Sequence, residues 1–124
     1  MRKILVILIM SLVGCRNVQR PVLEVDNPNY KFDTCLSHEK ISHVFSLKNI
    51  GNADLVISKI HSTCNCTVAF ADSIILRPSE KTDLKVEYNP AFFGDTGTVL
   101  QKIVLRNNSD SSIIFLTLSG YVRK

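Results

Sequence analysis

Short runs of alternating hydrophobic and polar residues fill most of the chain from residue 22 onward. In the clearest run, residues 82–88, Leu84, Val86 and Tyr88 alternate with charged residues. Alternation with a period of two predicts a strand that has one buried and one solvated face. By this criterion, and by their content of β-branched residues, strands are predicted at residues 22–25, 41–48, 55–60, 67–71, 82–88, 98–106 and 113–122, with residues 73–76 as an extension of the edge formed by residues 67–71.

Turn-forming residues separate these runs, and no segment carries a helical hydrophobic stripe for more than a turn or two. About seven strands in about 100 residues predict an all-β fold, an immunoglobulin-like antiparallel β-sandwich. An antibody-type domain is not expected, because the chain has no Trp and no cysteine pair at core strand positions. The predicted core consists of Phe45, Leu47, Leu55, Ile57, Leu84, Val86, Ile103, Leu105, Leu116 and Leu118.

The N-terminus has the organisation of a secretory signal. Arg2 and Lys3 precede an apolar run at residues 4–10. The largely apolar stretch spans only about 15 Å as a helix, half of a bilayer's hydrocarbon core, so a permanent transmembrane span is not expected. The sequence Leu-Val-Gly-Cys at residues 12–15 resembles a bacterial lipobox, which implies cleavage before Cys15 and attachment of lipid to this cysteine. The alternative is a plain secretory signal in which Cys15 is incidental.

These features divide the chain into a signal peptide at residues 1–14, the lipidated Cys15 with a short polar tether at residues 15–21, and one sandwich domain at residues 22–124. Six tether residues reach at most about 20 Å, so the domain should sit close to its membrane. The expected location is the bacterial cell envelope, with the protein lipid-anchored and facing the periplasm or the outside.

Charge and size exclude some classes of function. The formal charge of +4 includes Arg2 and Lys3, and without them 13 basic residues stand against 11 acidic ones. The basic residues are scattered, so nucleic-acid binding is not expected. With 124 residues and 45% hydrophobic content, the chain can bury a core without a metal. We therefore expect no obligatory cofactor.

Strands that run up and down the sandwich place alternate loops at opposite ends. One end, the cysteine pole, should receive Cys35 and His38, then His61, Cys64 and Cys66, then residues 89–94. The other end, the tether pole, should receive residues 49–54, 77–81 and 107–112 together with the tether. We therefore expect the cysteine pole to point away from the membrane.

Three arrangements of the thiols remain open. An oxidising compartment favours a disulfide from Cys35 to Cys64 or Cys66, and closing a loop of about 30 residues would contribute roughly 3 to 4 kcal/mol. A Cys64–Cys66 bridge would close a tight, more easily reduced ring and would permit a redox role. The third arrangement is a copper(I) or zinc site made by Cys35, Cys64 and Cys66 with His61 or His38, since thiolate and imidazole suit these metals.

Catalytic motifs are absent from the sequence: it contains no Gly-x-Ser-x-Gly, no phosphate-binding glycine loop and no His-Glu-x-x-His. An enzyme is not expected. Phe92 and Phe93 have two interpretations: one of them covers the core from its loop, or both are exposed and form a contact patch for a protein partner. His43 is predicted to be a surface or edge side chain.

Several motifs together resemble a known family. They are Phe45, Leu47, Asn49-Ile50-Gly51, Leu55, Ile57, Cys64-Asn65-Cys66-Thr67, Leu76-Arg77-Pro78-Ser79-Glu80, Val86, Tyr88-Asn89-Pro90, Gly94 and Gly97. This pattern resembles the bacterial domain-of-unknown-function family 1573 over residues 30–122. The resemblance implies an envelope protein, often a lipoprotein, with an immunoglobulin-like fold similar to sperm proteins and pilus chaperones; it implies no reaction.

The chain departs from the pattern of this family at three positions. Asn65 and Ser79 stand where the family usually has Gly, and Cys35 has no counterpart. Asn tolerates a left-handed backbone nearly as Gly does, so we expect the Cys-x-Cys turn to be retained.

The predicted function is that of a non-enzymatic envelope lipoprotein. It would bind another, unidentified envelope protein through its exposed edge strands or its cysteine-pole loops. The alternative is a soft-metal or thiol-redox module that uses Cys64 and Cys66.

Overall fold

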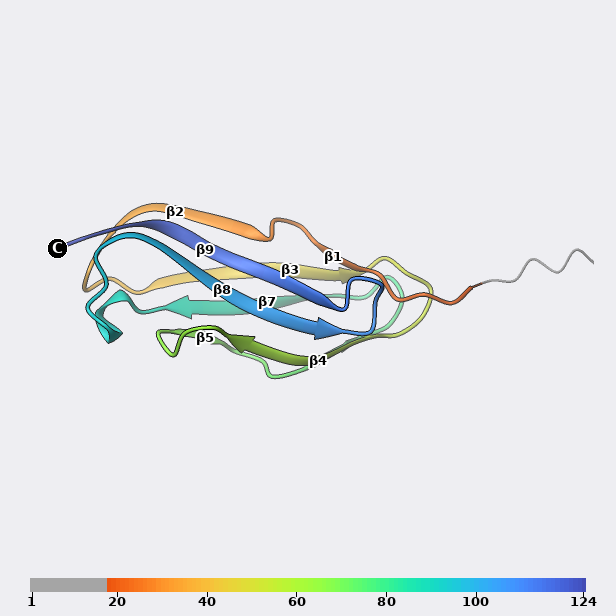
Figure 1. Ribbon diagram of the computed structural model, residues 1–124. Coiled ribbons are helices and arrows are strands. Elements are labelled where there is room, and N and C mark those ends of the chain that lie inside the picture. The colour runs from red at the N-terminus through yellow and green to blue at the C-terminus, as the bar shows by residue number, and fades with distance from the viewer. Residues whose placement is uncertain (1–17) are drawn as a thin grey trace, which may run out of the picture.

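The computed structural model describes residues 18–124, so the predicted signal peptide and Cys15 lie outside the described residues. Within this range the chain forms nine strands and one 3-10 turn (Figure 1). They are β1 (Leu23–Val25), β2 (Asn29–Leu36), β3 (Ile41–Asn49), β4 (Leu55–Ser62), β5 (Thr67–Ala69), β6 (Ile74–Leu76), β7 (Lys81–Tyr88), η1 (Pro90–Phe92), β8 (Gly97–Asn107) and β9 (Ile113–Arg123). In this part of the chain no helix is long and apolar enough to cross a membrane.

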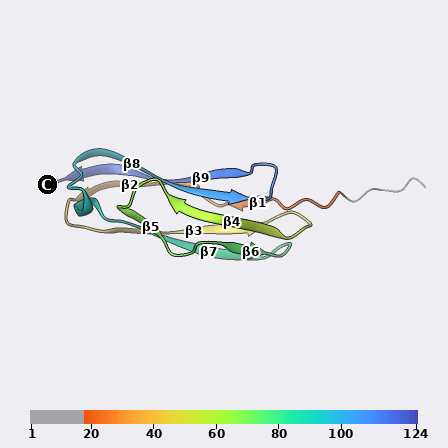
Figure 2. The ribbon, with the colours of Figure 1, turned by 60° about the horizontal axis from the view of Figure 1, so that its bottom comes forward.

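The strands form two sheets that pack face to face. One sheet has the order β1-β3-β7-β5, and the other has the order β2-β9-β8-β4-β6. Figure 2 shows the two layers, with β3 and β7 in one and β8 and β9 in the other. The all-β, immunoglobulin-like sandwich predicted from the sequence is confirmed.

The core lies between the inward faces of the two sheets. All ten predicted core residues are buried, and Leu47, Ile57 and Leu118 are fully so. Alternation places these side chains inward because period-two strands turn every second residue to the same face. The spacing of hydrophobic residues was therefore sufficient to identify the centre of the fold.

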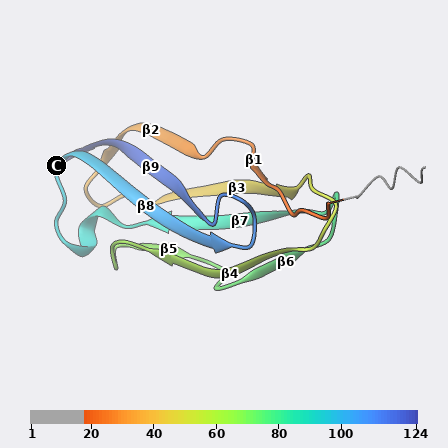
Figure 3. The same ribbon diagram turned by 45° about the vertical axis from the view of Figure 1, so that its right-hand side comes forward.

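The sequence did not predict β2. The chain leaves the first sheet after β1 and joins the second as β2, which pairs in parallel with β9 (Figure 3). Asp33 has a positive φ of 61°, and the register with β9 shifts between Lys31 and Thr34. This bulge interrupts the alternation, so that Phe32 and Cys35 both face the core although they are three residues apart.

The tether is hydrogen-bonded to the sandwich rather than hanging from it. The Asn52 backbone N–H donates to the Arg20 carbonyl at 3.0 Å, and the Ile50 N–H donates to the Val22 carbonyl at 2.9 Å. A Cβ on Gly51 would overlap the Arg20 carbonyl oxygen and would lie 2.6 Å from the Val22 nitrogen. The absence of a side chain at Gly51 thus lets the tether approach the loop after β3.

A buried asparagine organises the same pole. The Asn49 side-chain amide donates to the carbonyls of Ala53 at 2.7 Å and Leu76 at 3.0 Å, and its oxygen accepts from the Gly51 N–H at 3.0 Å. The same oxygen accepts from the N–H of Val22 at 3.3 Å. One side chain therefore ties the tether to the loops that follow β3 and β6.

Candidate functional site

The loop that carries Cys64 and Cys66 joins β4 to β5 at the end of the sandwich opposite the tether. The Ser62 hydroxyl contacts the carbonyl oxygens of Cys64 and Thr67, each at 2.6 Å. The Asn89 N–H donates to the Cys66 carbonyl at 2.8 Å, which fixes the loop to the segment after β7. The cysteine pole predicted from the alternation of loops is therefore present.

The structure places Cys64 next to Cys66. Their Cα atoms are 5.2 Å apart and their sulfur atoms lie at bonding distance, while the Cys66 N–H donates to Cys64 Sγ at 3.2 Å. Cys35 is a free, buried cysteine on β2. The favoured pairing, from Cys35 to Cys64 or Cys66, is not the arrangement in the structure, because Cys35 belongs to a strand and not to a pole loop.

Two polar side chains lie against Cys66. The Gln101 amide oxygen is 3.3 Å from Cys66 Sγ, and the Thr67 hydroxyl is 3.7 Å from the same sulfur. The Thr67 hydroxyl also donates to Gln101 at 3.4 Å. The sequence analysis did not single out Gln101. Gln101 lies two residues before Ile103 on β8, so its side chain is on the inward face of the strand. A polar residue among the apolar residues of an inward face could have indicated a polar contact in the core.

A buried tyrosine extends the polar contacts of this pole. The Tyr88 hydroxyl donates to Asp95 Oδ2 at 2.6 Å. Burial raises the pKa of Tyr88, and the hydrogen bond to Asp95 adds to the effect. Burial also raises the pKa of the Cys35 thiol, with a smaller contribution from the Glu39 carboxylate. Both groups are therefore protonated at neutral pH, and Cys35 lacks the thiolate character that a reactive cysteine needs.

The predicted metal ligands do not converge. Within residues 18–124, no three His, Cys, Asp or Glu side chains lie close enough together to hold one ion. His38 is exposed in the turn after β2, and His61 is on β4 opposite Val104, where its Nδ1 is buried without a hydrogen-bond partner. The site of Cys35, Cys64, Cys66 and His61 is thus not assembled in this structure.

Phe92 and Phe93 are both exposed, at 55% and 62% of their surface. Their rings pack edge to face with centroids 4.7 Å apart. The expectation that one of them covers the core is wrong, because Pro90 is the buried residue of this turn. The two rings instead project from the cysteine pole (Figure 1 shows η1 at the end away from the tether).

His43 was predicted to be a surface or edge side chain; it is half-buried and lies on β3 outside the residues that pair with β1. It faces inward beside Phe45 and stacks on Tyr30 of the opposite sheet, with ring centroids 3.8 Å apart and an angle of 9° between the planes. Burial lowers the pKa of His43. The sequence could have indicated this inward position, because His43 is two residues before Phe45 on β3 and residues i and i+2 of a strand lie on the same face.

One half of β3 is an open edge of its sheet. β1 pairs with β3 only from Leu23 opposite Asn49 to Val25 opposite Leu47, and β2 then crosses to the other sheet. The Asp26 N–H donates to the Ser46 carbonyl, so even-numbered residues of β3 direct their backbone groups away from β7. Among the described residues, no strand pairs with this side of β3 at Ser42 and Val44.

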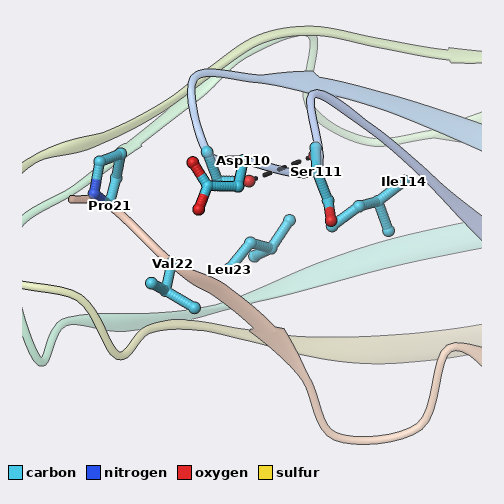
Figure 4. A pocket seen from close by; sticks show the side chains of 7 residues that line it. Pro21, Val22, Leu23, Asp110, Ser111 and Ile114 are labelled. Atoms are coloured by element: carbon cyan, nitrogen blue, oxygen red, sulfur yellow. Dashed lines mark hydrogen bonds between the residues drawn. The ribbon is translucent and has the colours of Figure 1, made fainter.

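One cavity lies at the tether pole and is smaller than typical small-molecule sites. It has a volume of about 120 Å³, against the roughly 300 to 1,000 Å³ of typical small-molecule sites. Figure 4 shows Pro21, Val22 and Leu23 on one side of it and Asp110, Ser111 and Ile114 on the other. This cavity is the seam between the tether and the β8–β9 loop.

Comparisons with known proteins agree with this fold. The model of a family described as proteins of unknown function (DUF1573) matches residues 23–122. A search of the curated proteins finds no match. A crystal structure of a protein of unknown function from Porphyromonas gingivalis W83 is similar with a TM-score of 0.74 at 14% identity, over 90% of this chain and 51% of that one. This chain thus spans about half the length of that protein.

Two eukaryotic domains have the same architecture. The seventh ASH/PapD-like domain of human CEP192 has a TM-score of 0.62 at 14% identity, over 82% of this chain and 85% of that one. WR4, an MSP family member of C. elegans, has a TM-score of 0.58 at 12% identity, over 82% of this chain and 97% of that one. At such low identities these similarities establish the fold alone.

Proposed function

The chain belongs to the DUF1573 family of proteins of unknown function, and from this premise we propose that it is a non-enzymatic, lipid-anchored protein of the bacterial cell envelope. It binds an extended segment of another envelope protein along the open half of β3. The observation that carries this proposal is that, within residues 18–124, no strand pairs with the edge of β3 at Ser42 and Val44.

An open strand edge is a template for another strand because it presents unpaired N–H and C=O groups. The backbone groups of Ser42 and Val44 face away from β7, and the Val44 side chain is 50% exposed on the outer face of the sheet. An incoming strand would therefore gain main-chain hydrogen bonds and an apolar contact with Val44. β7 continues the sheet on the other side of β3, so the edge is held in an extended conformation before binding.

The lipid anchor follows from the lipobox-like sequence that ends at Cys15. The hydrogen bonds of Arg20 and Val22 to the loop after β3 support an orientation in which the tether pole faces the membrane. Replacing Cys15 by Ser should move the protein from the membrane fraction to the soluble fraction and should abolish incorporation of labelled palmitate. A Cys15→Ser protein that stayed in the membrane would argue against the anchor.

Strand addition is tested by removing one backbone N–H. In Val44→Pro the lost N–H is one that faces the open edge, so the ladder with β7 is retained. Val44→Thr is the matched control, because it keeps the N–H and the β-branched shape. A photo-cross-linking residue at Ser42 should capture a partner in intact cells with the Thr variant and lose it with the Pro variant.

The same comparison also separates this proposal from a failure to fold. Both variants are first compared by thermal unfolding, and the cross-linking result is interpreted at a temperature where both are folded. Equal cross-linking by both variants would show that main-chain pairing at β3 is not the binding mode.

A further inference from the structure

Cys64 and Cys66 differ in accessibility. Cys66 is 2% exposed, whereas Cys64 is half-buried beside the exposed Asn65. Exchange between a thiol and a disulfide begins when a thiolate reaches one of the two sulfur atoms. Cys64 is therefore the more accessible of the two residues to a thiolate from solution.

The contacts of Cys66 suit a sulfur that departs with negative charge. The Thr67 hydroxyl can turn its hydrogen toward Cys66 Sγ at 3.7 Å. The Gln101 amide lies 3.3 Å from the same sulfur, and a half-turn about its last bond would present its NH₂ group there. Hydrogen bonds to a thiolate stabilise it, and a more stable leaving thiolate departs faster.

We propose that Cys64 and Cys66 form a disulfide that exchanges with a dithiol protein of the cell envelope, with Cys64 as the attacked sulfur and Cys66 as the leaving sulfur. A thiolate of the partner bonds to Cys64 Sγ, the bond between Cys64 and Cys66 breaks, and its electron pair goes to Cys66. The partner's second thiolate then attacks the partner's first sulfur, which is bonded to Cys64 in the mixed disulfide. Cys64 leaves as a thiolate. Overall, the two thiols of the partner are oxidised to a disulfide, and the Cys64–Cys66 disulfide is reduced by two electrons. The two thiolates of this chain take up two protons.

The third cysteine of the domain does not compete in this exchange. Cys35 is 4% exposed in the core, and burial together with the Glu39 carboxylate raises the pKa of its thiol. A buried, protonated thiol is a poor nucleophile. Exchange at Cys64 uses no residue of the β3 edge or of the lipid anchor, and only the location of its partner rests on the proposed function.

The first test uses glutathione because, as a monothiol, it lacks the second thiol with which a dithiol partner would release Cys64 from the mixed disulfide. The full-length protein in detergent is treated with reduced glutathione, quenched with acid and mapped by mass spectrometry. We expect glutathione on Cys64 and a free thiol at Cys66. Glutathione on Cys66, or on both residues equally, would overturn the proposal, as would free thiols at both positions before any reductant is added.

Single-cysteine variants make the same test quantitative. In Cys66→Ser the remaining Cys64 thiol should react with oxidised glutathione at least about ten-fold faster than the Cys66 thiol that remains in Cys64→Ser, because Cys64 is the more exposed residue. Both variants lack the bridge, so loss of the bridge cannot explain a difference between them. Equal rates would show that burial does not direct the exchange.

A second test addresses Gln101 as a positioning residue. Gln101→Glu keeps the shape but places a carboxylate beside the departing sulfur, whereas Gln101→Leu only removes the amide. We expect reduction of the pair by glutathione to slow by about ten-fold or more in the Glu variant and by several-fold in the Leu variant. If both variants react at the rate of the original protein while their melting temperatures shift, Gln101 has only a structural role and the assignment of Cys66 as the leaving sulfur is wrong.

Discussion

Ser79 departs from the usual pattern of its family, and the turn that contains it is hydrogen-bonded to the end of β3. It occupies a left-handed conformation with φ of 69° in the turn before β7, at the position where the resemblance leads us to expect Gly. Its N–H still donates to the Asn49 carbonyl at 2.8 Å. A residue with a Cβ in this region is strained by roughly 1 to 2 kcal/mol relative to Gly. Asn65, by contrast, is not among the described residues with a positive φ, so the Cys-x-Cys turn does not depend on a left-handed Asn.

Ser79→Gly should therefore stabilise the domain, by about 0.5 to 1 kcal/mol after the greater flexibility of Gly in the unfolded chain is subtracted. Ser79→Ala is the control, since Ala keeps the Cβ and should give no gain. Urea unfolding of the three proteins measures the difference. A Gly variant no more stable than the Ala variant would mean that this turn relieves its strain in another way.

His43 links stability to pH because it is half-buried between Tyr30 and Phe45. Burial lowers its pKa in the folded state, so the unfolded chain binds a proton at a higher pH than the folded one does. The contribution to stability is full above the ordinary histidine pKa of about 6.5 and is lost as the pH falls below it. His43→Phe preserves an aromatic stack on Tyr30 and removes the titration. Urea unfolding at pH 7.5 and pH 5 should show a smaller loss of stability on acidification for this variant; an equal loss in both proteins would exclude His43 as a source.

At the scale of the strand, adjacent residues of β3 place their side chains on opposite faces of the sheet. Phe45 is 1% exposed in the core, and Val44 is 50% exposed opposite Lys85. Phe45→Asp should cost more than about 4 kcal/mol, since it buries an unpaired charge, and a small domain has only about 5 to 15 kcal/mol to lose. Val44→Asp should change the free energy of unfolding by no more than about 0.5 kcal/mol, because the new carboxylate lies beside Lys85 in water.

Circular dichroism during thermal unfolding distinguishes these outcomes. The Phe45 variant should have no cooperative transition near that of the original protein, and the Val44 variant should unfold like it. Two variants that were equally destabilised would contradict the assignment of the two faces.

The alternation seen in β3 also explains what the sequence could and could not predict. The clearly alternating β7, and β8 with its β-branched residues, were predicted nearly to the residue. β2 was missed because the bulge at Asp33 shifts its phase and because its partner β9 is about 90 residues away along the chain. At the cysteine pole, the sequence identified the loops but not the contacts of Gln101 or the stack of Tyr30 on His43, since these join residues from opposite sheets. Such contacts depend on packing between sheets, which periodicity along one strand does not encode.

At the scale of the whole molecule, the two poles have different chemistry. The tether pole presents Val18 at 59% exposure and Ile50 at 51%, and two residues separate Val18 from the predicted lipid attachment at Cys15. Three residue steps span at most about 11 Å, so a tether that is hydrogen-bonded from Val18 onward would hold this pole near the headgroups. Phe92 lies at the other end of the molecule, beyond β8, whose 11 residues extend over roughly 35 Å.

The chain contains no Trp, so a single introduced Trp reports on its own surroundings. We expect the fluorescence of Ile50→Trp in the lipid-modified protein, reconstituted in vesicles with brominated acyl chains, to be quenched several-fold more than that of Phe92→Trp. The reason is that such quenching requires near contact, and the two poles are separated by about the thickness of a bilayer's hydrocarbon core. Cosedimentation with vesicles first establishes that both variants are anchored, which separates a failure of the anchor from a failure of the orientation. Equal quenching of two anchored variants, or stronger quenching of the Phe92 variant, would mean that the domain lies on its side or inverted, with the cysteine pole against the membrane and Cys64 less accessible to a partner from the aqueous phase.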